Sequence, residues 1–135
     1  MKTTYRNILA IIIGLIIGSG VNMGLILISG FVIPPPEGAD VSSMEALKAT
    51  LHLFEARHFI FPFLAHGLGS LVGAYVAAQL AANHKMKFAL SIGGFFLIGG
   101  IMNIINLPSP VWFSAVDLIG AYIPMAWIGG KLARA

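Results

Sequence analysis

The sequence contains no cysteine, and this absence excludes several classes of protein together. Disulfide frameworks, thiolate metal sites, thiol redox enzymes and cysteine nucleophiles all depend on this residue. Charged residues are also scarce, at 10% of 135 residues, whereas about a quarter of the residues of a soluble domain are charged. Phosphate-binding glycine loops, dinucleotide fingerprints, the H-E-x-x-H zinc motif and serine-nucleophile motifs are missing too. Hydrolases and kinases of the soluble type are therefore set aside.

Apolar residues, by contrast, make up 58% of the chain. A compact soluble domain of this length cannot bury so much apolar surface, so the excess needs lipid. The net charge of +3 comes from eight Lys and Arg residues that lie beside the apolar runs. We expect them to contact anionic lipid headgroups rather than nucleic acid. The sequence therefore predicts an integral membrane protein whose first partner is the lipid bilayer.

Four stretches approach the length of about 20 mostly apolar residues that a helix needs to span a bilayer. They cover residues 7–33, 58–82, 88–106 and 111–130. The short connections at 83–87 and 107–110 favour antiparallel neighbours. We predict an all-α membrane protein, in which residues 1–135 form a single domain of four antiparallel transmembrane helices.

The connection between the first two spans, residues 34–57, is the one long loop. Ser42 and Glu45 have the spacing of a capping box. Apolar residues then recur every three or four positions, at Met44, Leu47, Leu51 and Phe54. This pattern predicts an amphipathic outer helix over 43–57, either continuous with the second span or bent onto the outer surface.

Basic residues are distributed unevenly between the two ends of the predicted spans. Six of them fall on the side of both termini: Lys2, Arg6, Lys85, Lys87, Lys131 and Arg134. Only Lys48 and Arg57 fall on the other side, among acidic residues. By the positive-inside rule, we expect both termini to be cytoplasmic.

Each predicted span carries one costly polar residue in its outer half. These residues are Asn22, His66, Asn103 and Asp117, roughly 3–9 Å from the midplane at ~1.5 Å per residue. Asp117 is the only acid within a predicted span, and His66 lies at a similar depth. Such a pair can relay protons, bind a cation or hold an anionic substrate. The alternative is a structural polar pair that fixes the register of the helices.

Glycines recur on one face of each span, where they allow close approach of a neighbouring backbone. We predict that these glycines pack the helices together: Gly14, Gly18, Gly69, Gly73, Gly93, Gly100 and Gly120. Because the polar residues share these faces, the simplest assembly directs both kinds of residue into the bundle.

A second candidate site is the sequence H-x-x-E-x-x-H formed by His52, Glu55 and His58. A spacing of three places consecutive side chains one helical turn apart, near enough to share a divalent transition metal. His66 would be a further ligand, and Asp117 a ligand or base. The alternative is a solvated face of the outer helix with no metal.

Several segments resemble those of a group of small bacterial membrane proteins with four spans. The segments are residues 21–24, 34–36, 61–69, 108–113 and 121–127. The resemblance covers nearly the whole chain, and it implies a four-span fold in the bacterial inner membrane. It implies no activity and no catalytic residue.

Three functions follow as hypotheses. The first is a protein that binds or transports a small polar molecule, a proton or a metal ion in an outward-open pocket, as a homo-oligomer or with a membrane partner if it conducts anything. The second is a membrane-embedded metalloenzyme with His and carboxylate ligands. The third is an accessory subunit whose polar residues only hold its helices together.

Overall fold

A computed structural model describes residues 2–134, and all their regular secondary structure is helical. Four helical segments are long and apolar enough to cross a membrane, as the sequence predicts. They comprise α1 (Thr3–Val32), α3 (Ile60–Leu80) with the short turn before it, α4 (Lys85–Asn106), and the pair α5 (Val111–Gly120) and α6 (Ile123–Arg134). The prediction of an all-helical fold with four helices that could span a membrane is therefore confirmed.

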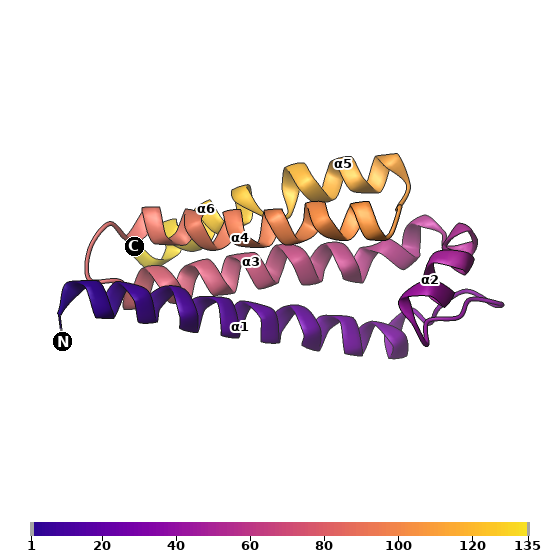
Figure 1. Cartoon of the computed structure of the whole chain (residues 1–135), viewed down its shortest axis with the longest axis horizontal. Helices are drawn as coiled ribbons and strands as arrows, with labels where there is room; N and C mark the ends of the chain where they lie inside the picture. Colours follow the sequence, from indigo (N-terminus) through magenta and orange to yellow (C-terminus); the bar gives the residue numbers. More distant parts are fainter. Residues whose placement is uncertain (1, 135) are drawn as a thin grey trace.

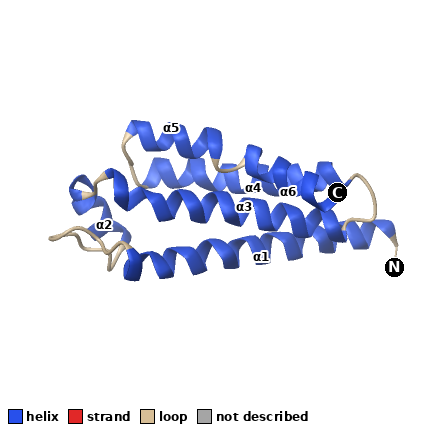
Figure 2. Cartoon of the chain, turned by 180° about the vertical axis from the view of Figure 1, so that it is seen from behind, coloured by secondary structure: helices blue, strands red, loops and turns tan. Residues whose placement is uncertain are grey.

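The helices lie alongside one another in a long, narrow bundle (Figure 1). The chain begins and ends at one end of this bundle, and α2 (Met44–Thr50) lies at the opposite end. Figure 2 shows that the loops are confined to the two ends of the bundle, apart from the short break between α5 and α6. Helix α3 is the central element, because it packs against α1, α4 and α6.

The fourth predicted span, 111–130, is interrupted, because α5 ends at Gly120 and α6 begins at Ile123. Pro124 explains this break. It lacks the N–H that would bond to the carbonyl of Gly120, and its ring would clash with that carbonyl in a continuous helix. The span nevertheless continues in the same direction and ends at Arg134 rather than at residue 130.

The outer helix is much shorter than the predicted 43–57, since α2 ends at Thr50 and only the short turns η1 (Leu51–Leu53) and η2 (Ala56–Phe59) follow. The hydroxyl of Thr50 accepts a bond from the Asp40 amide at 3.0 Å, which anchors the end of α2 to the loop before it. The Glu55 amide donates to His58 Nδ1 at 2.8 Å, which fixes a separate turn. Ser43, rather than the predicted Ser42, caps α2 by accepting from the Ala46 amide. Side chains thus replace the backbone bonds of a longer helix.

Close glycine contacts hold α1 against α3 in the half of the bundle near the termini. A Cβ atom at Gly14 would lie 2.8 Å from the carbonyl oxygen of Gly73, and one at Gly18 would lie 2.7 Å from that of Gly69. Buried alanines and Ile92 fill the space beside these crossings. This half of the bundle is densely packed.

Polar contacts fasten the same end of the bundle. Arg6 Nε donates to the carbonyl of Leu80 at 2.7 Å, and the side chain of Asn7 bonds to Asn83 and to the Ala82 amide. Lys85 Nζ donates to the carbonyl of Ala78 in the last turn of α3 and to that of Ala81, the residue that follows the helix, and it thereby satisfies acceptors at a helix end.

Toward its C-terminal end, α1 has no such neighbours. A Cβ atom at Gly24 or at Gly30 would meet nothing within 4 Å. In this half of the bundle, Asn22, Ile26 and Ser29 of α1 line a cavity, so α1 packs less closely near α2 than it does near the termini.

Candidate functional site

A buried cluster of three polar side chains joins α3 to the broken span. His66 Nδ1 lies 2.8 Å and 3.0 Å from the two carboxylate oxygens of Asp117. The hydroxyl of Tyr122 donates to Asp117 Oδ2 at 3.1 Å, and its ring stacks on that of His66 with 5.6 Å between centroids. The Asp117 side chain is 3% exposed and that of His66 is 20% exposed. The imidazole is thus held by a carboxylate that is itself fixed from a second side.

The break between α5 and α6 places Tyr122 in this cluster. In an unbroken helix, residues 117 and 122 would point about 140° apart, at 100° per residue. The break redirects the chain after Gly120, and the hydroxyl of Tyr122 reaches back to the carboxylate of Asp117. Gly100 supplies the room for its ring, because a Cβ atom on Gly100 would overlap the ring of Tyr122.

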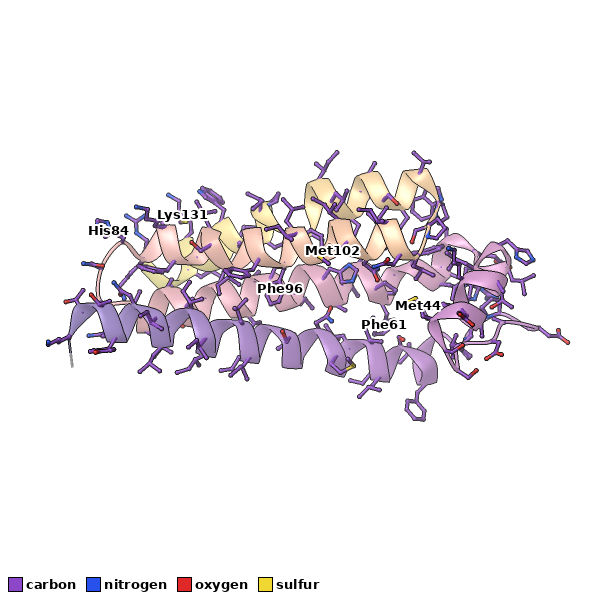
Figure 3. The ribbon with its side chains drawn as sticks, viewed as in Figure 1. Met44, Phe61, His84, Phe96, Met102 and Lys131 are labelled. Carbon is purple, nitrogen blue, oxygen red and sulfur yellow. The ribbon has the colours of Figure 1, made fainter. Side chains whose placement is uncertain are left out.

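A cavity of about 800 Å³ lies beside this cluster, between α1, α3, α4 and the outer segment. Three of the four predicted pocket residues line it, namely Asn22, His66 and Asn103. Asp117 stands behind His66 and does not line the cavity. The walls are mostly apolar, as is usual for pockets that bind small molecules. Figure 3 places Phe61 and Met44, two of the lining residues, near the α2 end and Phe96 nearer the middle of the bundle.

Ser70 is a further polar residue of the cavity wall. It is fully buried, and its hydroxyl has no hydrogen-bond partner among the residues that the structure describes. A buried hydroxyl without a partner is uncommon and costs stability. Because Ser70 follows His66 by four residues, both lie on the same face of α3.

Sequence reasoning missed Tyr122 and Ser70 as members of the site. Pro124 was the available signal for Tyr122, since a proline two residues later predicts a break at that point. For Ser70 the signal was its spacing of four from His66, on the side of α3 that also carries Gly69 and Gly73.

The structure does not assemble the predicted metal site. Within residues 2–134, no group of three or more His, Asp or Glu side chains could hold a metal ion. Glu55 and His58 bond to each other's backbone and side chain across one short turn, while His52 belongs to the preceding turn. His66 is engaged with Asp117 in a different part of the bundle. The H-x-x-E-x-x-H spacing therefore stabilises a turn.

The chemistry of the site follows from which ring nitrogen of His66 is occupied. A carboxylate that accepts from Nδ1–H fixes the orientation of the ring and leaves Nε2 for the cavity. Nε2 then accepts a hydrogen bond in the neutral ring, or donates one in the protonated ring. No protein-family model, curated protein or solved structure matches this chain.

Proposed function

We propose that this chain is an integral membrane protein that binds a small molecule in the outer-half cavity, with His66 as the group that recognises it. The observation that carries the proposal is the Asp117–His66–Tyr122 cluster at the wall of a cavity of about 800 Å³. Intramembrane ionisable groups are costly and are commonly functional. Asp117, which lies behind the cavity wall, and Tyr122, which is part of the wall, both contact His66 or its carboxylate partner and so hold the imidazole in place.

The close packing of the half of the bundle near the termini supports a binding site rather than a channel that runs through the whole bundle. The cavity ends where Gly18 crosses Gly69, and beyond this point the core consists of closely packed small residues and Ile92. A molecule in the cavity therefore meets a closed floor. This geometry suits a receptor or carrier of a ligand taken from one side.

Binding through His66 can be tested with phenol, a small ring that carries one hydroxyl group. Phenol is expected to raise the thermal unfolding midpoint of the purified native protein, because a ligand that binds only the folded state stabilises it. His66→Gln should weaken the apparent affinity about tenfold, the equivalent of one hydrogen bond of roughly 1.4 kcal/mol.

The matched control is His84→Asn, which removes a histidine from the opposite end of the bundle, as Figure 3 shows. Asparagine suits position 84 because the backbone there is left-handed, with φ of 47°. Equal responses of the native protein and of His66→Gln to phenol, or no response of either, would contradict the proposal.

We also propose that the four spans run antiparallel through a bacterial inner membrane, with both termini in the cytoplasm. The uneven distribution of basic residues supports this orientation. In Figure 3, Lys131 lies near the end of the bundle that carries the termini, and Met44 near the other end.

This orientation can be tested with single cysteines, because the native chain has none and so gives no background. In intact cells, a membrane-impermeant maleimide is expected to label Glu37→Cys and to leave Lys87→Cys unlabelled until the membrane is opened. Labelling of Lys87→Cys alone would reverse the proposed orientation.

A further inference from the structure

The outer-half cavity reaches the side of the bundle between α1 and α4. These two helices make few contacts with each other, since α1 packs mainly on α3. Leu27 on α1 lines the cavity and is still 66% exposed. Across the gap, Gly99 and Asn103 on α4 both line the cavity and are exposed. Since these residues belong to membrane-spanning helices, the side opening faces lipid.

Apolar residues partly cover the end of the cavity nearest α2. Apolar residues of α2 and the turns after it contribute to the lining there, among them Leu47, Leu51 and Phe54. All three are half-buried. Val41, Met44 and Arg57 also line this end and are exposed, so the roof is partial, and the gap between α1 and α4 is the opening that lies along the membrane-spanning helices.

The polar groups of the cavity lie deep and are suited to an uncharged partner. Asn22 lies beside the Gly18–Gly69 crossing that forms the floor, and Ser70 lies one turn deeper than His66 on α3. Of the described residues that line the cavity, none is acidic, and Arg57 is the only lysine or arginine. Arg57 lies in the outer turn η2, and its side chain is 65% exposed. A hydroxyl or carbonyl oxygen matches these groups better than a charged head does.

We propose that the ligand is an uncharged amphiphile dissolved in the bilayer. Its hydroxyl or carbonyl head bonds to His66 and to the unpartnered hydroxyl of Ser70, and its apolar tail leaves through the gap between α1 and α4. This inference rests on the proposed function and adds to it the chemical class of the ligand and its pose.

The pose can be tested with dodecanol and a dodecanol analogue that carries a diazirine at the end of its chain. In lipid nanodiscs, photolysis is expected to label residues 22–32 of α1 and 98–106 of α4, and excess dodecanol should suppress this labelling. Labelling confined to residues 44–54 of the roof, or labelling that dodecanol leaves unchanged, would overturn the pose.

The side opening offers two glycines for a matched pair of variants. A Cβ atom at Gly99 or at Gly94 would meet nothing within 4 Å, yet only Gly99 lines the cavity. Gly99→Phe is expected to weaken dodecanol binding at least about tenfold, measured by native mass spectrometry or thermal shift, and Gly94→Phe to leave it unchanged. If the two variants bind dodecanol equally well, the proposal that the ligand occupies the gap between α1 and α4 is wrong.

Ser70→Ala tests the head of the ligand. Dodecanol should bind about tenfold more weakly to this variant, the equivalent of one lost hydrogen bond. The thermal unfolding midpoint of the free variant should be equal to or above that of the native protein, because the unpartnered hydroxyl is gone. A lower thermal unfolding midpoint together with unchanged dodecanol binding would show that Ser70 stabilises the fold and does not bind the ligand.

Two comparison ligands separate this inference from the proposed function. Dodecane has the same chain without the hydroxyl, and it should bind to the native protein at least about tenfold more weakly than dodecanol. If phenol binds through His66 while dodecane matches dodecanol, the amphiphile inference fails and the proposed function stands. If neither phenol nor dodecanol binds, both fail.

Discussion

Gly73→Val is expected to lower the free energy of unfolding by about 3 kcal/mol or more, at the upper end of the range for overpacked cores. A Cβ atom at Gly73 would lie 2.7 Å from the carbonyl oxygen of Gly14 and 3.2 Å from Gly18 Cα. Both atoms belong to the backbone of α1, so no side-chain rotation relieves the overlap. Valine would force α1 away from α3 at this crossing.

The measurement is reversible unfolding in mixed micelles, followed by the far-ultraviolet circular dichroism of the helices. Gly20→Val is the matched control, because a Cβ atom at Gly20 would meet nothing within 4 Å. Valine has a higher helix propensity than glycine, so this control should be neutral or slightly stabilising. Similar losses for the two variants would show that the Gly14–Gly73 contact does not hold α1.

The number and approximate bounds of the long helices could be predicted from the sequence, because a bilayer sets the length of apolar helix that crosses it. The outer segment could not be predicted in the same way. Its apolar residues have helical spacing, yet α2 ends at Thr50, whose hydroxyl bonds to Asp40. Which side chain competes with a short helix depends on how the loop folds back, and periodicity carries no information about this.

The site was predictable to the extent that it follows from depth in the membrane. His66 and Asp117 lie at similar positions along different predicted spans. In the structure, His66 Nδ1 lies 2.8 Å from Asp117 Oδ1. Tyr122 joins them only because the chain breaks before Pro124 and because Gly100 leaves room for a ring. Proline indicates where a helix is weakened, but the direction of the chain after the break depends on tertiary packing.

Asp117→Ala is expected to have the second large effect, with a loss of about 2–4 kcal/mol in the free energy of unfolding. The variant removes the partner of His66 Nδ1 and of the Tyr122 hydroxyl together. Single hydrogen bonds between membrane helices contribute about 0.6 kcal/mol on average, since unfolded helices find other partners. Asp117 should exceed this value because it is 2% exposed and bonds to two side chains, His66 and Tyr122.

Two variants resolve the contributions within this cluster. Tyr122→Phe removes one of the two bonds to Asp117 and should lower the free energy of unfolding by about 1 kcal/mol. Val116→Ala changes a half-exposed side chain of α5 and should lower it by less.

Asp117→Ala should also abolish the phenol response, because His66 then loses the group that orients its ring. The accessory-subunit hypothesis gives a different result: Asp117→Ala would be destabilised by the same amount, while neither the native protein nor Val116→Ala would respond to phenol. Stability and ligand response, measured on the same four proteins, therefore separate a binding site from a purely structural polar cluster.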